Sequence, residues 1–513
     1  MRPWRGIAAF ALLIALVIVA VAIAAGVGEE PTGGQRGEQP NIIVVMTDDQ
    51  AVSTLEQGLP NTLEWMSERG TRFNNMIVTT PLCCPSRATL QSGGYGHNNG
   101  VLRNNPGYPD LKGKGDVLPV WLDKAGYETA LVGKFMNGYG RDDPAEAASP
   151  APGWNEWRET VRPYAYVDFA LSVNGDVRDY DDDQYLTDVL TRQAVDIVEE
   201  NAKDPQPLYM WLSYWAPHAE GVEANDVNGR CRGSAVPSQD DVETLAAVTP
   251  PQPGAYNEAD VSDKPRAVRR RPRLQTGGED LVAENFACHV ASLRAVDRGF
   301  EKLVDALERV GELDNTVLIV YSDNGFVHGE HRITNGKSLP YEPAIKVPLM
   351  VSAPEGLLDG EQVPEVDLPV ANIDLAPTIL DLADAAPCRQ RDKCRTLDGR
   401  SFTPLLVGRD GEWPSNRTLL IEAAEGQPCP FTGVRTDRYV YVEYGVAKGP
   451  CDPDERELYD LADDPFELDN LLATEPEAVA AEADALAATL AELRDCAGID
   501  GRDPEPPSGH YCE

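Results

Sequence analysis

Four side chains with hard oxygen ligands lie two or three residues past two apolar segments that are far apart in the chain. These side chains are Asp48, Asp49, Asp323 and Asn324. The preceding segments, 41–46 (NIIVVM) and 316–321 (TVLIVY), are rich in β-branched residues and lack the alternation of a half-exposed strand. They therefore predict central parallel strands that are buried on both faces. Open α/β sheets bind ligands at the carboxyl ends of such strands, where carboxylate and amide oxygens suit Ca²⁺ or Mg²⁺ and not zinc.

A cysteine-containing segment, residues 83–87 (CCPSR), lies between these two strands in the chain. Arg87 follows Cys83 by one helical turn, so in a helix it can orient a nucleophile at that position and offset its charge. Three other residues can neutralise or protonate an anionic substrate: Lys134, His218 and Lys337. A lone lysine is usually solvated and a lone histidine is usually a hydrogen-bonded core or turn residue. A function can therefore be assigned to these three residues only if other parts of the sequence support it.

Several segments together resemble the type I, formylglycine-dependent sulfatases of the alkaline phosphatase superfamily, and within them the N-acetylglucosamine-6-sulfatases. The segments are 83–87 (CCPSR), 133–140 (GKFMNGYG), 185–190 (YLTDVL) and 216–218 (APH). The resemblance extends from about residue 41 to residue 471, and 457–461 (ELYDL) resembles part of the C-terminal signature of that family. It implies an α/β fold with a large mixed, mostly parallel sheet flanked by helices. A smaller C-terminal antiparallel sheet with one helix is expected to follow.

The resemblance also implies a chemistry for Cys83. A formylglycine-generating enzyme would convert this cysteine into an aldehyde, whose hydrate is the nucleophile. The modified residue would bind one divalent cation together with Asp48, Asp49, Asp323 and Asn324; Ca²⁺ is the commoner cation in the family and Mg²⁺ is the alternative. In the family mechanism the metal polarises the sulfate and lowers the pKa of a hydrate hydroxyl, which attacks sulfur in line with the departing alcohol. The second hydroxyl then expels sulfate.

The remaining roles follow from the same resemblance. Lys134 and Lys337 match the sulfate-contacting lysines, Arg87 matches the arginine that supports the nucleophile, and His218 matches a general acid for the leaving alcohol. His328 and His331 follow the second metal-ligand segment and are candidates for substrate contacts. Many sulfatases carry a histidine two residues after the first lysine, but here Met136 stands there, and the next residue, Asn137, becomes a further substrate-contact candidate.

The resemblance implies a sulfate monoester as substrate, and we expect it on a sulfated sugar or glycosaminoglycan unit. Three alternatives stay open at this stage. They are a broad-specificity arylsulfatase, a phosphonate or phosphodiester hydrolase on the same scaffold, and an inactive homologue that acts as a surface binding protein.

The N-terminus predicts export. Residues 1–5 (MRPWR) are basic and residues 6–28 form a nearly unbroken apolar run, as in a signal peptide. The run is also long enough to span a bilayer, where ~20 residues suffice, so cleavage and retention as a membrane anchor both stay open. In either case the catalytic part is expected outside the cytoplasm. The predicted organisation is a signal or anchor (1–28), a linker (29–39), a catalytic domain (40–413) and a C-terminal α+β subdomain (414–513).

Ten cysteines fit an exported protein, because disulfides persist outside the cytoplasm. With Cys83 modified and Cys84 left as a thiol, eight cysteines remain for up to four bridges. The expected local pairs are Cys388–Cys394, Cys429–Cys451 and Cys496–Cys512, although connectivity cannot be read from a sequence. A zinc site is the alternative, but no C-x-x-C pair supports it.

The formal net charge of −39 argues against nucleic acid as a partner and requires any sulfate site to be locally positive. One basic cluster lies at 264–273. This cluster could attract a polyanionic glycan. We favour the alternative, in which it is a solvated loop whose charges are paired with acidic neighbours.

Further elements are predicted from periodicity and caps. The expected strands cover 208–214, 417–422, 438–443 and 457–461. A helix is expected over 286–310, ended by Gly311, and a C-terminal helix is expected to follow a capping box at 474–477. Residues 219–280 lack periodicity and predict long surface excursions of the kind that often carry function.

Overall fold

The computed structural model describes residues 39–141, 143–161, 165–220, 230–387, 394–423, 430–445 and 454–513. The strands are β1 (Asn41–Thr47), β2 (Thr71–Phe73), β3 (Met76–Ile77), β4 (Glu128–Gly133), β5 (Glu156–Val161), β6 (Phe169–Val173), β7 (Asp176–Tyr180), β8 (Leu208–Ser213), β9 (Thr316–Ser322), β10 (Leu349–Ser352), β11 (Glu365–Val366), β12 (Val370–Ala371), β13 (Leu419–Ala423), β14 (Phe431–Arg435), β15 (Tyr439–Tyr444) and β16 (Arg456–Asp460). The α-helices are α2 (Leu55–Gly58), α3 (Pro60–Arg69), α4 (Cys83–Ser92), α5 (Gly96–Asn99), α6 (Leu118–Ala125), α7 (Pro144–Ala148), α8 (Leu186–Asn201), α9 (Arg266–Arg269), α10 (Thr276–Val310), α11 (Glu342–Ile345), α12 (Leu375–Leu382), α13 (Thr403–Leu406), α14 (Leu471–Thr474) and α15 (Ala480–Leu493). Short 3₁₀ helices lie at 52–54, 108–110, 239–246, 313–315, 372–374 and 410–412.

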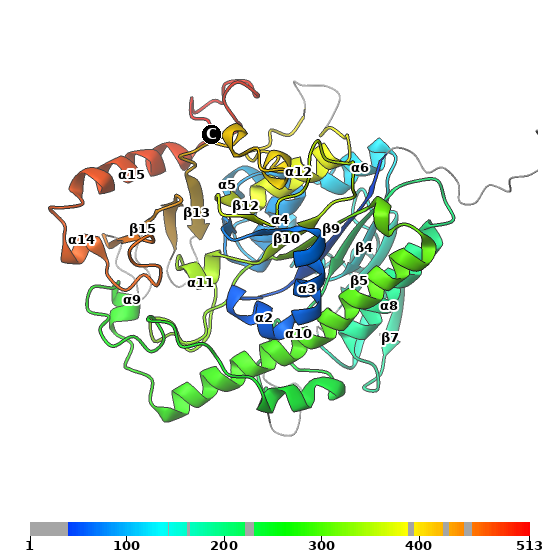
Figure 1. Ribbon diagram of the computed structural model, residues 1–513, viewed down its shortest axis with the longest axis horizontal. Coiled ribbons are helices and arrows are strands. Elements are labelled where there is room, and N and C mark those ends of the chain that lie inside the picture. The colour runs from blue at the N-terminus through cyan, green and yellow to red at the C-terminus, as the bar shows by residue number, and fades with distance from the viewer. Residues whose placement is uncertain are drawn as a thin grey trace, which may run out of the picture. The chain divides into compact units, whose positions relative to one another are not determined.

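Ten strands form one large sheet in the order β11-β2-β10-β9-β1-β8-β4-β5-β6-β7 (Figure 1). β1 runs parallel to both β8 and β9, and β4 runs parallel to β8 and β5. Antiparallel pairs lie toward the two edges, at β9-β10-β2 and at β5-β6-β7. The predicted mixed, mostly parallel sheet is therefore confirmed, and the three strands expected from apolar runs lie side by side at its centre.

Both faces of this sheet are covered by helices, which explains why β1 is apolar along its whole length. Ile42, Val44 and Met46 pack into the core on the side of α4, α6 and α12. Ile43 and Val45 point the other way, into the core formed with α3, α8 and α10. Successive side chains of a strand alternate between faces, so a strand covered on both sides needs apolar residues at every position.

The helix predicted over 286–310 is longer at its start than expected, because α10 begins at Thr276. Gly277 and Gly278 are poor helix formers and mask the first turns in the sequence. Tertiary contacts stabilise these turns: Val282 is buried, and Glu279 accepts a hydrogen bond from Asn257 Nδ2 at 2.9 Å. The prediction was correct at the other end, where Gly311 adopts a left-handed φ of 75° and terminates the helix.

The C-terminal part forms an antiparallel sheet in the order β13-β14-β15-β16, with α15 packed on it, as predicted. Figure 1 shows this sheet beside the large one. Its core also includes Ile77, Tyr95 and Ile345 from the catalytic part. Residues 38–513 form one compact unit, and the boundary near residue 413 stays a prediction.

The predicted capping box at 474–477 is wrong. Thr474 is the last residue of α14 and donates its hydroxyl to the carbonyl oxygen of Asn470 at 3.2 Å. The side chain of Asn470 caps α14 by accepting from the N–H of Leu472, so a separate turn forms first. Pro476 then disfavours helical backbone at the residue before it, and α15 begins at Ala480.

Two disulfides join described cysteines. The predicted Cys496–Cys512 bridge is present, and a second bridge joins Cys231 to Cys288. Cys388, Cys429 and Cys451 fall outside the described residues, as do the predicted signal or anchor and nearly all of the linker. Across the described ranges, no helix is both long and apolar enough to cross a membrane.

Candidate active site

The two predicted oxygen-ligand segments meet at the carboxyl ends of β1 and β9. The N–H of Asp49 donates to Asp323 Oδ1 at 3.2 Å, and Asn324 Nδ2 donates to Asp49 Oδ1 at 2.7 Å. Asp49 has a left-handed φ of 69°, an uncommon conformation for a non-glycine residue, as the chain turns away from β1. The parallel register, which pairs Thr47 with Ser322, therefore brings together residues 274 or 275 positions apart.

Cys83 is the first residue of α4, a helix whose residues are all buried. Its Sγ lies 3.4 Å from Asp48 Oδ1 and 2.8 Å from Lys337 Nζ. The amino end of a helix carries partial positive charge, which favours an anion at this position. Burial, followed by the charge of Asp48, raises the pKa of the Cys83 thiol to about 12, so the unmodified side chain is a neutral thiol and a poor nucleophile.

Arg87 lies one turn further along α4 and joins both carboxylate segments. Its Nε donates to Asp323 Oδ2 at 2.8 Å and its terminal nitrogens to Asp48 Oδ2 at 3.1 Å and Ser213 Oγ at 2.7 Å. The guanidinium is fully buried and also donates to the backbone carbonyls of Lys134 and Phe135. Arg87 thus ties α4 to the ends of β1, β4, β8 and β9.

Two lysines complete the positive charge of the cluster. Lys134 Nζ pairs with Asp48 Oδ2 and lies 4.6 Å from the ring centroid of Trp215, and Lys337 Nζ lies 2.5 Å from Asp49 Oδ1. Burial by itself would raise the pKa of Asp48, but the surrounding cations, Lys134 foremost, hold that pKa well below its usual range. Arg87, Lys134 and Lys337 thus match the three carboxylates Asp48, Asp49 and Asp323 in charge, so the locally positive site that the charge argument requires would form only with a bound cation.

His218 faces the carboxylates from the segment after β8. Its Nε2 lies 3.8 Å from Asp49 Oδ2, while Nδ1 lies 2.7 Å from the carbonyl oxygen of Ala219. Because a carbonyl oxygen accepts, Nδ1 carries the hydrogen in the neutral ring and Nε2 keeps its lone pair. Burial lowers the pKa of His218 to about 4. The side chain is still 25% exposed, so proton exchange with solvent or substrate is open to it.

The residues present fit a hard divalent cation. Asp48, Asp49, Cys83 and His218 offer ligand atoms within 4.8 Å of one another, and the buried Oδ1 of Asn324 has no hydrogen-bond partner. Burial, followed by the charge of Asp48, raises the pKa of Asp323 to about 6, so a second carboxylate charge beside Asp48 is costly. A bound divalent cation would offset this cost, and the carboxylate and amide oxygens favour Ca²⁺ or Mg²⁺.

The three predicted substrate-contact residues lie in separate surroundings. The backbone carbonyl of Asn137 lies 3.5 Å from Cys84 Sγ, and its own Oδ1 is buried without a partner. His328 packs at ring-centroid distances of 4.9 Å from His289 and 5.1 Å from Phe326. His331 instead lies beside Glu258, with 2.7 Å between Nδ1 and Oε2. His328 is close enough to the cluster for the charge of Asp49 to affect its pKa, and substrate contact by all three residues stays a prediction.

Sequence reasoning missed two residues that shape the site. The ring of Trp215 packs at a tilt against His218, with ring centroids 4.4 Å apart, and Lys134 lies over it. Ser213 accepts a hydrogen bond from Arg87. Ser213 ends β8, the strand beside β1, and Trp215 follows it. Their position at the carboxyl end of a predicted central strand could have marked them as site residues.

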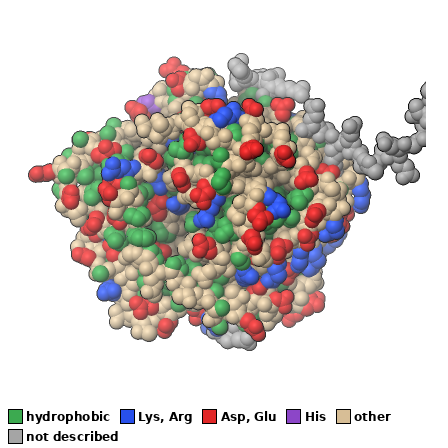
Figure 2. Space-filling model, viewed as in Figure 1, with side chains coloured by type: hydrophobic (Ala, Val, Ile, Leu, Met, Phe, Trp, Pro, Cys, Tyr) green, Lys and Arg blue, Asp and Glu red, His purple; other side chains and the backbone are tan. Residues whose placement is uncertain are grey.

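The basic cluster at 264–273 is at least partly neutralised by acidic neighbours. Lys264 is buried and bonds Asp263 at 2.8 Å, and Arg269 pairs with Glu455 at 3.1 Å. Figure 2 shows acidic side chains spread across the visible face of the molecule. These pairs support the favoured interpretation of a loop paired with acidic neighbours.

The fold and the site define a hydrolytic α/β enzyme with a buried, cation-compatible centre at the carboxyl edge of a mixed sheet. Residues 40–385 match the sulfatase family, and residues 329–495 match the family described as N-sulphoglucosamine sulphohydrolase, C-terminal. The chain therefore belongs to the sulfatase family and is an enzyme of the sulfuric ester hydrolase class.

Individual relatives agree with this assignment. The chain is 31% identical over 499 residues to an arylsulfatase of Volvox carteri, covering 90% of this chain and 75% of that protein. It is 30% identical over 398 residues to the human N-acetylglucosamine-6-sulfatase, covering 75% and 67%. Some curated relatives are longer, and the chain spans 33% of one of them. A solved protein in complex with its substrate D-glucosamine-2-N,6-O-disulfate superimposes with a TM-score of 0.72 at 22% identity, covering 89% of this chain and 98% of that one.

Proposed function

We propose that this protein hydrolyses sulfate monoesters of sugars, using formylglycine made from Cys83. The observation that carries the proposal is the position of Cys83 at the start of α4, in contact with Asp48 and Lys337. An unmodified thiol is out of place there, because its neighbours and its burial keep it protonated. The hydrated aldehyde offers one hydroxyl to attack sulfur and a second to release sulfate afterwards. A formylglycine-generating enzyme is the partner that this maturation requires.

The divalent cation would be held by Asp48, Asp49, Asp323, Asn324 and the modified residue 83. When bound, it would polarise the sulfate and favour ionisation of the nucleophilic hydroxyl. Ca²⁺ is the cation we propose first, with Mg²⁺ as the alternative.

The remaining roles belong to side chains of this chain. Lys134 and Lys337 would bind the sulfate oxygens, and Arg87 would hold the carboxylates and α4 in position. His218 would first take up at Nε2 the proton that the attacking hydroxyl loses and then pass it to the departing alcohol, while Nδ1–H stays bonded to the carbonyl oxygen of Ala219. The partial exposure of His218 is consistent with an alcohol that leaves toward solvent.

A sulfated sugar is favoured as substrate by the similarity to N-acetylglucosamine-6-sulfatases, and an aryl sulfate is the second candidate because of the similarity to algal arylsulfatases. Export would expose the enzyme to such glycans. The apolar N-terminal run and the two disulfides support export, by secretion or membrane anchoring.

The test combines mass spectrometry with turnover. Peptides spanning residues 81–87 are analysed from active protein, and release of sulfate is measured with N-acetylglucosamine 6-sulfate and with an aryl sulfate. We expect formylglycine at position 83, with hydrolysis of the sugar ester abolished in Cys83→Ala and retained in Cys84→Ser. The neighbouring thiol is the matched control because Cys84 is equally buried but its Sγ lies against the backbone carbonyl of Asn137, 3.5 Å away. Active protein with an intact Cys83 thiol would exclude the mechanism.

A further inference from the structure

The C-terminal segment 457–461 (ELYDL) begins in β16 and holds none of the residues assigned to the cation or the sulfate. Its first residue, Glu457, is fully buried. Three tyrosine hydroxyls donate to this carboxylate: those of Tyr341 and Tyr459 to Oε1 and that of Tyr444 to Oε2. Burial of a carboxylate is costly unless hydrogen bonds replace water, and these three donors do so. Tyr341 is the only one of the three that comes from outside the C-terminal sheet.

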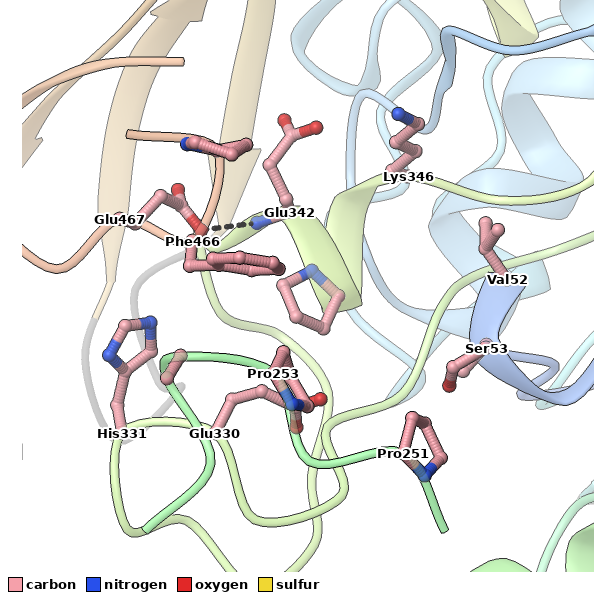
Figure 3. Close-up of a pocket in the computed structure, with 14 residues that line it drawn as sticks. Val52, Ser53, Pro251, Pro253, Glu330, His331, Glu342, Lys346, Phe466 and Glu467 are labelled. Carbon is pink, nitrogen blue, oxygen red and sulfur yellow. Dashed lines mark hydrogen bonds between the residues drawn. The ribbon is translucent and has the colours of Figure 1, made fainter. Parts of the chain in front are cut away.

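A second contact joins the same two parts of the chain one residue further along. The N–H of Glu342 donates to Glu467 Oε2 at 2.9 Å, which is the dashed line in Figure 3. The carboxylate of Glu342 in turn pairs with Arg435 of β14 at 2.8 Å. We call these contacts the C-terminal clamp. It consists of Glu457, Glu467 and Arg435 on one side and of Tyr341 and Glu342 on the other.

The clamped residues lie four and five positions after Lys337, where the loop that follows β9 enters α11. A second anchor holds this loop next to Lys337 itself. The N–H of Ser338 donates at 2.8 Å to the carbonyl oxygen of Pro81, two residues before Cys83. Ser338 has a left-handed φ of 61°, an uncommon conformation for a non-glycine residue that persists only where the surrounding contacts impose it.

The side chain of Lys337 depends on these anchors for its position. Its ammonium group lies 2.5 Å from Asp49 Oδ1 and 2.8 Å from Cys83 Sγ, at the end of a long and flexible stem. Because such a stem can place its charge in many positions, the backbone that carries it has to be fixed for the charge to stay at the nucleophile. The segment before α4 fixes this backbone on one side, and the C-terminal clamp fixes it on the other.

We propose that Tyr341 and Glu457 are positioning residues for Lys337, so that the C-terminal sheet supports catalysis by fixing the lysine that binds the sulfate. Tyr341 is 1% exposed and Glu457 is 0% exposed, so both act through the backbone of the loop and not by touching the substrate. The inference rests on the proposed function of Lys337 and extends it to a residue of β16.

The test removes the hydroxyl group of Tyr341 and nothing else. Tyr341→Phe keeps the ring, whose centroid lies 4.3 Å from that of His331, but deletes the bond to Glu457. The matched control is Tyr127→Phe, because Tyr127 is also 1% exposed and donates its hydroxyl to the carbonyl oxygen of Pro40, before the amino end of β1. We expect kcat/KM for N-acetylglucosamine 6-sulfate to fall by about tenfold in Tyr341→Phe and by less than about twofold in the control.

A double-mutant cycle separates positioning of Lys337 from a general loss of structure. If Tyr341 acts through Lys337, Tyr341→Phe should have almost no further effect once Lys337→Met has removed the ammonium group. A merely structural role would lower the residual turnover of Lys337→Met by the same factor as that of the wild type, and this result would overturn the inference. An unchanged kcat/KM in the single variant Tyr341→Phe would overturn it too.

Hydrogen exchange keeps this inference separate from the proposed function, because it requires no turnover. The N–H groups of Ser338 and Glu342 are bonded at the two anchors, so a peptide covering 336–345 reports on both. We expect this peptide to exchange faster in Tyr341→Phe than in the wild type or in Tyr127→Phe. That result supports the clamp even if no sulfate ester is hydrolysed, a failure that would count against the proposed function alone. Unchanged exchange rejects the clamp and leaves the sulfatase mechanism intact.

Discussion

Lys337 Nζ lies 2.8 Å from Cys83 Sγ, although 254 residues separate the two in the chain. Burial opposes a charge on Lys337, but Asp49 and Cys83 together raise the pKa of this lysine well above its usual range. A permanent cation therefore stands beside the residue that is proposed to become the nucleophile, where a sulfate oxygen has to be bound.

Lys337→Met is expected to lower kcat/KM for a sulfate ester by about 10²–10³-fold, the loss typical of one preorganised donor to a developing charge. Steady-state sulfate release measures the effect. Lys302→Met is the matched control, because that side chain is 56% exposed on α10. Less than a fivefold loss in Lys337→Met would contradict a role in sulfate binding.

Arg87→Met is expected to lower the free energy of unfolding by about 3–5 kcal/mol, because it leaves two buried carboxylates without their cation. Urea unfolding followed by fluorescence measures this change. The control is Arg309→Met, which removes an exposed pair with Glu199 and is expected to cost about 0–1 kcal/mol. Similar losses in both variants would show that the Arg87 network does not hold the site together.

His218→Asn is expected to affect substrates according to their leaving groups. A sugar alcohol needs a proton as it leaves, so hydrolysis of a sugar sulfate should fall by about 10²–10⁴-fold. Nitrophenyl sulfate has an acidic leaving group and should lose far less. Comparing kcat/KM for the two esters separates proton donation from simple disruption of the site, which would reduce both equally. His510→Ala serves as a control because its side chain is 40% exposed and lies far along the chain, paired with Asp495.

Calcium is expected to raise the Tm of the chelator-treated protein by a few °C at saturating metal. The reason is that a ligand which binds the folded state but not the unfolded state stabilises the folded state by mass action. Asn324→Leu keeps the volume of the side chain but removes the buried, unpartnered Oδ1, so its Tm should respond much less to Ca²⁺. Differential scanning calorimetry with and without CaCl₂ makes the comparison, and Asp314→Asn at an exposed position is the control. An identical calcium response in Asn324→Leu would exclude Asn324 as a ligand.

Glu159 gives a pH-dependent prediction at a distance from the metal ligands. This carboxyl group lies on β5, is 4% exposed, and has a pKa that burial raises well above its usual range. The folded state therefore keeps a proton that the unfolded state releases near its ordinary pKa of about 4.3, and stability falls as the pH rises between the two values.

Glu159→Gln removes this titration. The variant is expected to be more stable than wild type at pH 7, by about 1 kcal/mol or more, and the difference should vanish below about pH 4. Urea unfolding midpoints at pH 4, 6 and 8 measure it, with Glu301→Gln as the exposed control. A stability difference that does not change with pH would contradict the assignment to Glu159.

Local sequence was sufficient for the centre of the sheet. The runs at 41–46 and 316–321 are apolar at every position because both faces of their strands are covered, and this pattern distinguishes them from half-exposed strands. Local sequence was less reliable where tertiary contacts outweigh helix propensity, as in the first turns of α10 and at Thr474. β14 went unpredicted because Gly433 interrupts its apolar pattern.

At the candidate active site, too, some features follow from local sequence and others only from tertiary packing. Residue types and the segment at 83–87 were enough to propose a cation, a nucleophile and its cationic partners, since those chemical properties belong to the side chains themselves. Strand register and helix packing decide which of these residues meet. They place Lys337 against Cys83 and give His328 and His331 different neighbours, His289 and Glu258.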